Sequence, residues 1–178
     1  MLPSLIGVIA SSGGGVATSY ESIATVTVGA GGSATITFSS IPSTYQHLQL
    51  RATMLTTSAS NIVARFNSDN AANYSQHQLV GDGSSASSGA NVATNSPYFG
   101  YTNTQPGVMI VDILDYKDTN KYTTSRILTG SDANGAGIVL FRSAVWMSTA
   151  AVNQIDVTVN GGANFNQYSS FALYGIKG

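Results

Sequence analysis

The sequence predicts an all-β protein, an antiparallel β-sandwich with a jelly roll among the topologies it allows. Residues 47–54 alternate apolar and polar side chains without a break, and Leu48, Leu50, Ala52 and Met54 share one face. A period of two indicates a strand with one buried face. Similar segments recur at intervals of roughly 8 to 15 residues, as in sandwiches. No window shows the period of about 3.6 residues, with capping signals, that a helix requires.

Residues 37–54 are the organising unit, two strands joined by a turn in which Pro42 fixes the backbone angle φ. Before this unit, we expect residues 20–38 to form a hairpin around Gly-Ala-Gly-Gly at residues 29–32. Asn134-Gly135 predicts a connection between two antiparallel strands. Further strands are expected at residues 62–67, 74–80, 107–114, 122–129, 138–149, 155–159 and 167–176.

Residues 107–114 (GVMIVDIL) and 138–149 are the most apolar predicted strands. The first is apolar on both faces except for Asp112, as expected of a central strand or of one covered by another subunit. In the second, Val139 and Phe141 alternate with Arg142 and Trp146. Because Trp and Arg carry much of the binding energy at interfaces, Arg142 and Trp146 are the candidate subunit interface. The nine tyrosines are alternatives for packing or for stacking on sugar rings.

Residues 81–96 (GDGSSASSGANVATNS) contain almost no apolar side chain large enough to bury, so they are predicted to form a long loop. Long loops in compact domains are often functional. Asp82, Ser84, Asn91 and Asn95 are therefore the candidate exposed recognition residues. The alternative is a surface excursion with no role in binding.

The chain divides into residues 1–18, an arm with a glycine hinge, and residues 19–178, a single β-sandwich domain. The arm begins MLPSLIGVIA, lacks basic residues, and is too short to span a bilayer. We interpret it as an anchor that packs against a partner; a signal peptide is the alternative. Its partner-binding residues are predicted to be Leu2, Leu5, Ile6, Val8 and Ile9.

The composition excludes several classes of function. Charged residues make up 8% of the chain, the formal net charge is −1, and lysines and arginines are scattered, which argues against nucleic-acid binding. The chain has no cysteine, so thiol catalysis, disulfides and cysteine-ligated zinc are excluded. No segment predicts membrane association.

Catalytic groups are sparse. Glu21 is the only glutamate, so paired carboxylates would have to come from aspartates such as Asp112, Asp115 and Asp118. A structural hydrogen bond or a pair with an arginine is the expected role of Asp112. The sequence therefore predicts a protein that is not an enzyme and that carries no cofactor.

Metal ligands are equally few. His47 and His77 lie on different predicted strands and lack a third ligand, so hydrogen bonding is the expected role of both. Calcium is the least implausible metal, but the loop spacing of a calcium motif is missing, and ordinary Asx turns are favoured. The residues concerned are Asp115, Asp118 and Asn120, or Asp132 and Asn134.

Four segments together carry a resemblance to a known family. They are FSSIPSTYQHLQLR (residues 38–51), FNSDNAANYSQHQLVGDGSS (66–85), VDILDYKDTNKYTTSRILTGSDANGAG (111–137) and QYSSFALYGIKG (167–178). They resemble small virion proteins of tailed bacteriophages, as seen in phages of aquatic bacteria including cyanobacteria. The resemblance covers most of the chain after residue 20 and rests on turn and strand residues.

The resemblance implies a β-sandwich on the surface of the phage particle. The favoured role is a head decoration (cement) protein that binds the major capsid protein, or another virion protein, through its arm and stabilises the head. The alternative is a tail or fibre component that binds a host-surface glycan or receptor. Related modules commonly self-associate, so a homotrimer is expected.

Overall fold

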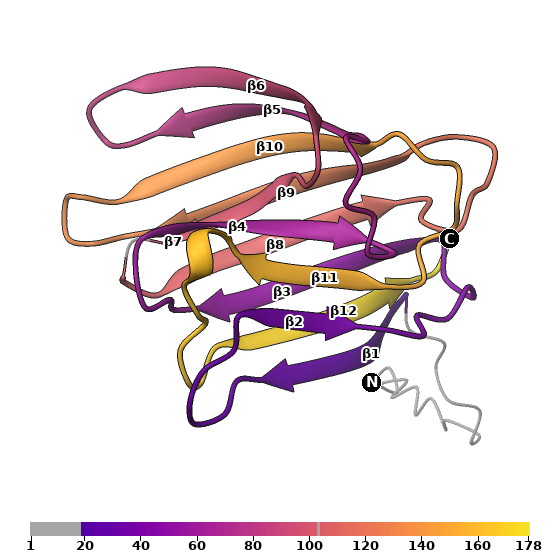
Figure 1. Cartoon of the computed structure of the whole chain (residues 1–178), viewed down its shortest axis with the longest axis horizontal. Helices are drawn as coiled ribbons and strands as arrows, with labels where there is room; N and C mark the ends of the chain where they lie inside the picture. Colours follow the sequence, from indigo (N-terminus) through magenta and orange to yellow (C-terminus); the bar gives the residue numbers. More distant parts are fainter. Residues whose placement is uncertain (1–18, 103) are drawn as a thin grey trace, which may run out of the picture.

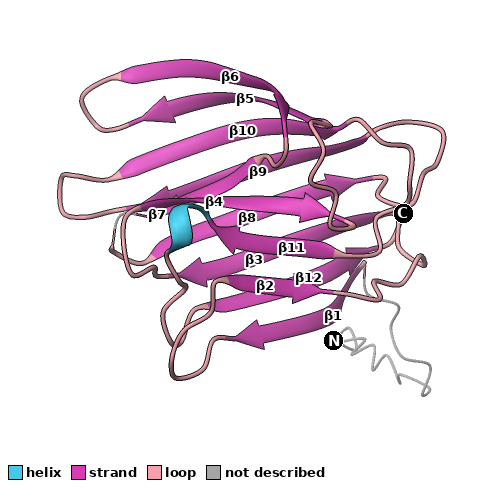
Figure 2. Ribbon diagram, in the orientation of Figure 1, coloured by secondary structure: helices cyan, strands magenta, loops and turns pink. Residues whose placement is uncertain are grey.

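The computed structural model describes residues 19–102 and 104–178, which form two antiparallel sheets and one 3-10 helix (Figures 1 and 2). The predicted all-β sandwich is confirmed. The described helix is far too short to cross a membrane. The strands are β1 (Tyr20–Thr27), β2 (Thr35–Phe38), β3 (His47–Met54), β4 (Ser60–Phe66), β5 (Tyr74–Gly81), β6 (Ala86–Thr94), β7 (Tyr98–Thr102), β8 (Gly107–Leu114), β9 (Thr123–Ser131), β10 (Ile138–Trp146), β11 (Ile155–Val159) and β12 (Ser170–Ile176).

Eight of these strands form a jelly roll. The large sheet has the order β1-β12-β3-β8-β9-β10-β5-β6, and the small sheet has the order β2-β11-β4-β7. When β5, β6, β9 and β10 are set aside, the first strand pairs with the last, the second with the next to last, and so on inward. This is the pairing of a long antiparallel ribbon wrapped into two sheets, as in a jelly roll.

The other four strands widen only the large sheet. β9 and β10 follow β8 as a hairpin, and β5 and β6 complete the row, so that β6 is the far edge. Figure 1 shows β5, β6 and β10 extending past the small sheet. We call β9, β10, β5 and β6 the extension. The small sheet has four strands and the large sheet has eight, so the small sheet does not cover all of the extension.

The core lies between the inner faces of the two sheets. Leu48, Leu50 and Met54 are at most 1% exposed and Ala52 is 7% exposed, so the predicted alternation of β3 is confirmed. Segments far apart in the sequence pack closely together in this core, as residues 45 and 175 do. Gly175 lies directly over the ring of Tyr45, which a Cβ at that position would approach to 2.2 Å.

The predicted hairpin of residues 20–38 is wrong. β1 pairs with β12 in the large sheet, whereas β2 pairs with β11 in the small one. Gly31 and Gly32, with φ of 97° and 75°, allow the chain to cross from one sheet to the other. Alternation identifies which residues share a face, but it does not identify the strand that supplies the hydrogen bonds.

Residues 81–96 are also not a long loop. They contain the end of β5, a short turn and the edge strand β6, and β7 follows as a further strand that the sequence did not indicate. Most side chains of β6 are exposed on both faces, so the strand needs no apolar row and shows no amphipathic pattern. The Asn134-Gly135 connection is confirmed, since it joins β9 to β10 with positive φ at both residues.

Candidate functional site

The outer face of the large sheet carries a set of exposed apolar side chains, which we call the outer strip. Each is between 42% and 60% exposed, and all lie on neighbouring strands β8, β9, β10 and β5. An apolar group of this size on a soluble protein indicates a contact surface. The outer strip consists of Leu79, Val108, Ile110, Leu128, Val139 and Phe141.

The strand register sorts this face into two rows. The first row holds large side chains on four successive strands, Ile110, Leu128, Phe141 and Leu79. The second row alternates valine with glycine: Val108, Gly130, Val139 and Gly81. Because glycine has no side chain, each valine of the second row stands beside a gap.

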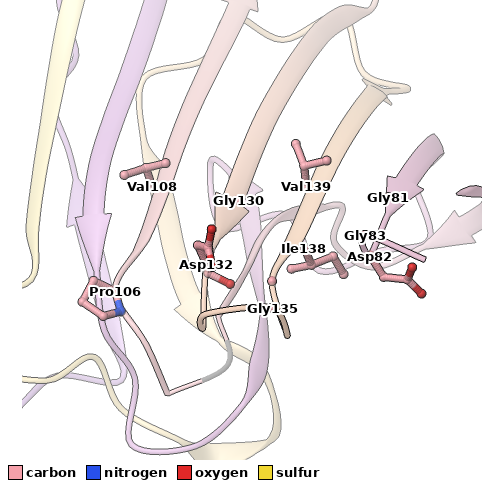
Figure 3. Close-up of a pocket in the computed structure, with 12 residues that line it drawn as sticks. Gly81, Asp82, Gly83, Pro106, Val108, Gly130, Asp132, Gly135, Ile138 and Val139 are labelled. Atoms are coloured by element: carbon pink, nitrogen blue, oxygen red, sulfur yellow. The ribbon is translucent and has the colours of Figure 1, made fainter. Parts of the chain in front are cut away.

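A pocket of about 600 Å³ lies over the valine-glycine row. Figure 3 shows Val108 and Val139 on either side of Gly130, with the Asp132 carboxylate next to them. Two further hollows open on the same face, one around Phe141 and one around Ile110. The outer face is therefore an uneven surface of apolar ridges and hollows.

Charged groups stand at both ends of the outer strip. At one end Arg126 on β9 faces Asp112 on β8, and His77 lies on β5 two residues before Leu79. At the other end the turns after β5 and β9 carry the exposed acids Asp82 and Asp132. Asp112 offsets the charge of Arg126 at the first end, whereas the second end carries two acids.

The inner face of the extension is mixed, because it buries polar side chains among apolar ones such as Ile127, Leu140 and Trp146. Arg142 of β10 is 3% exposed, donates through Nε to Gln78 Oε1 at 3.0 Å, and lies 5.5 Å from the centre of the Tyr98 ring. Burial lowers the pKa of Arg142 to about 10. The neighbouring strand β9 buries four hydroxyl side chains, Thr123, Ser125, Thr129 and Ser131.

Arg142 and Trp146 do not form a subunit interface, because both side chains point inward. Trp146 is 3% exposed, stacks on Tyr74 at 6.3 Å, and donates through Nε1 to Asp69 Oδ2 at 2.7 Å. The predicted alternation of β10 is correct, but the choice of face is reversed. Val139 and Phe141 occupy the exposed side. Arg142 and Trp146 can be buried because each has a hydrogen-bond partner inside the domain.

The four predicted recognition residues fall on different structures. Asp82 and Ser84 lie in the turn between β5 and β6, Asn91 lies within β6, and Asn95 lies just after it. The turn is held by the Asp82 carboxylate, which accepts from Ser84 N at 2.9 Å and from Ser85 N at 2.7 Å, as well as from both hydroxyls. These bonds, the one from the Ser84 amide first, hold the pKa of Asp82 well below its ordinary value.

We expect Asp82→Asn to reduce the loss of stability at acid pH. Because the folded-state pKa of Asp82 is lowered, its stabilisation is complete above the ordinary pKa of 3.8 and declines as the pH falls below that value. Urea unfolding at pH 6 and at about pH 2.5 should show a smaller drop for Asp82→Asn than for the unmodified chain. Ser85→Ala, which keeps the carboxylate, should lie between the two. Equal drops in all three would contradict the assignment.

The cluster of charges at residues 115–121 is a structural turn. The Asp115 carboxylate is paired with Lys121 and accepts from the side chain of Gln46, and the Lys121 hydrogen bond is the main reason that its pKa is lowered. Asp118 accepts from Asn120 N at 2.8 Å, an ordinary Asx turn. Asp132 accepts from Asn134 N at 2.9 Å in the same way.

The other candidate ligands are separated. His47 Nδ1 accepts from the backbone amide of Asp115 at 2.9 Å, Asp112 accepts from Gln49 Nε2 at 2.6 Å, and His77 is exposed on β5. Among residues 19–102 and 104–178, no three His, Asp or Glu side chains are placed to hold a metal ion. The anchoring residues Leu2, Leu5, Ile6, Val8 and Ile9 lie outside the described residues.

Sequence reasoning missed the outer strip as a site. The signal that was available is the apolar character of residues 107–114 on both faces, which predicted a central or a subunit-covered strand. The structure makes β8 both central and exposed on one side, through Val108 and Ile110. Comparisons of this chain with family models, with curated proteins and with solved structures found no match.

Proposed function

We propose that this protein is a non-enzymatic structural component of a tailed-bacteriophage particle, a decoration protein on the surface of the head. In this proposal residues 1–18 bind the major capsid protein, or another virion protein, and the sandwich covers and stabilises the shell. The resemblance described above suggests the particle. The contact surfaces of the chain suggest the structural role.

The observation that carries the proposal is the apolar outer face of the extension. Its inner face buries Arg142 and several hydroxyl groups, whereas its outer face exposes Leu79, Leu128 and Phe141. In an isolated domain this exposed apolar area contributes no stability, whereas its burial is worth about 25 cal/mol per Å². The arrangement is favourable when the outer face is covered by another protein, as in an assembled particle.

The arm supplies the second contact of the proposal. The first ten residues are rich in apolar side chains that suit a groove or a sheet edge on a partner. The proposed anchors are Leu2, Leu5, Ile6, Val8 and Ile9. Binding by an extended peptide gains affinity from main-chain hydrogen bonds and from apolar anchors. The glycines at residues 13–15 would let the sandwich adjust its orientation on the shell.

Deleting residues 1–15 is expected to abolish incorporation into particles while leaving the sandwich folded. The described strands all fall between residues 20 and 176, so the circular dichroism spectrum and the unfolding midpoint of the domain should stay close to those of the full chain. Occupancy is measured by mass spectrometry of purified particles, and position by immunogold labelling in the electron microscope.

A matched control replaces only Ser4, Ser11 and Ser12 with alanine, which leaves the apolar anchors intact and should preserve occupancy. Normal occupancy of the truncated chain would overturn the anchoring role. Labelling at the tail instead of the head would favour the fibre alternative. The exposed turn of Asp82 and Ser84, at the rim of the large sheet, would then be the surface to test for binding to host glycans.

A further inference from the structure

We infer that the outer strip binds a second copy of this chain, so that two large sheets pack face to face about a twofold axis. This goes beyond the proposed function, because it names the partner of one surface and the symmetry of the contact. It rests on the register of the strands and on the chemistry of the exposed residues, and it holds whether the particle contact is at the head or at the tail.

The first argument is shape. A twofold axis that lies in the interface and runs across the strands, between the two rows, places each strand over its own copy in the reverse direction. Leu128 then faces Gly130 of the second copy, and Leu79 faces Gly81. Large side chains on β9 and β5 thus meet the gaps left by glycine, and twofold symmetry repeats each contact.

The central strands fit the same operation. On β8 Ile110 faces Val108 of the second copy, and on β10 Phe141 faces Val139. These are apolar contacts of the kind that fill the space between two sheets packed about 10 Å apart. Shape and hydrophobicity therefore complement each other across all four strands of the outer strip.

The second argument is charge. The same axis brings the end that carries Arg126 over the acidic end, so that Arg126 meets Asp132 of the second copy and His77 lies near Asp82. Arg126 is exposed and forms no ion pair within the described part of the chain. An axis parallel to the strands would instead place the acidic ends, with Asp82 and Asp132, against each other, and like charges in contact oppose association.

The third argument is area. Eight strands of about eight residues, about 4.8 Å apart and with a rise of about 3.3 Å per residue, give a sheet face on the order of 900 Å², of which the four strands of the outer strip make up about half. A standard protein interface buries about 800 Å² on each partner. The dimer reaches this area when the contact extends from the outer strip over most of the outer face of the large sheet. A dimer differs from the homotrimer suggested by the resemblance, so the mass of the assembly separates the two.

The test is the mass of the purified full-length chain in solution, by light scattering and by sedimentation at several concentrations. We expect twice the monomer mass of 18.4 kDa at micromolar concentrations. Leu128→Glu, which places a charge opposite Gly130 and near Asp132 of the second copy, should weaken dimerisation by at least about tenfold. Thr35→Glu, at an exposed position on β2 of the opposite, small sheet, is the matched control and should remain dimeric.

A compensating pair makes the test specific to the proposed register. Gly81→Val fills a gap of the second row, where an added Cβ meets only the side chain of Val139, at 3.4 Å. Gly81→Val alone should weaken the dimer, and adding Leu79→Ala to the same chain should restore it, because Leu79 of one copy faces Gly81 of the other. Circular dichroism confirms that each variant is folded.

A monomer at all accessible concentrations, a trimer, or a dimer that the Leu128 and Gly81 variants do not affect would each overturn the inference. The particle plays no part in these measurements, so their outcome is independent of the arm deletion. A monomeric chain whose Leu128→Glu variant loses occupancy on particles would show that a different virion protein covers the strip, and would leave the proposed function standing.

Discussion

Trp146→Ala is expected to destabilise the domain by about 3 to 5 kcal/mol, among the largest effects of any single truncation in this chain. Trp146 is 3% exposed, packs against Phe66 at 5.7 Å and Tyr74 at 6.3 Å between ring centres, and donates to the Asp69 carboxylate. The substitution leaves a cavity and removes the hydrogen bond that, after the one from Asn73, contributes most to lowering the pKa of Asp69. The measurement is urea unfolding followed by circular dichroism.

Phe141→Ala is the matched control, since it removes an aromatic ring from the same strand on the opposite face. Phe141 is 51% exposed in the isolated chain, so its loss should cost no more than about 1 kcal/mol. Both variants are compared at submicromolar concentration, where association contributes least to the apparent stability. A larger cost for Phe141→Ala than for Trp146→Ala would mean that the faces of β10 are assigned the wrong way round.

Gly175→Ala is expected to destabilise the domain by about 3 kcal/mol or to prevent folding. A Cβ at residue 175 would lie 2.2 to 2.4 Å from three ring atoms of Tyr45. Tyr45 is 9% exposed and its hydroxyl donates to Glu21, so the ring has little freedom to move. Overpacking of this kind commonly costs about 1 to 3 kcal/mol, and a contact this short belongs at the upper end.

A double-mutant cycle tests the cause. In a Tyr45→Ala background, adding Gly175→Ala should cost less than about 1 kcal/mol, because the ring that it meets is gone. Gly29→Ala is the control for the backbone effect of replacing a glycine, since a Cβ at residue 29 has no neighbour within 4 Å. If Gly175→Ala cost the same with and without the Tyr45 ring, the clash would not be the reason that glycine is needed.

Some features of the core can be predicted from the sequence and others cannot. The inward set of β3, including Leu48 and Leu50, could be read directly, because a single amphipathic strand carries its whole signal in its own residues. The need for glycine at 175 could not be read, because it depends on Tyr45, which is 130 positions away in the chain. Trp146 is an intermediate case, because the sequence predicted the alternation of β10 but not which of its faces is buried.

The candidate site follows the same rule. The exposed apolar side chains of the outer strip, such as Leu128 and Phe141, resemble ordinary core residues in the sequence, and hydrophobicity alone would bury them. Their exposure arises because β9, β10, β5 and β6 widen one sheet of the jelly roll while the other keeps four strands. The buried face of the extension is instead supported by Arg142 and its hydrogen bonds.

By itself the sequence determined the strand-rich character of this protein, the positions of most strands, the Asn134-Gly135 connection and the absence of cysteine chemistry. Each of these depends on residues close together in the chain, where periodicity and turn chemistry act. Only the tertiary structure decided that residues 20–38 are divided between two sheets, that residues 86–94 form an edge strand, and which face of β10 is buried. These depend on partners far away in the sequence, whose hydrogen bonds and packing fix the pairing and the direction of each strand.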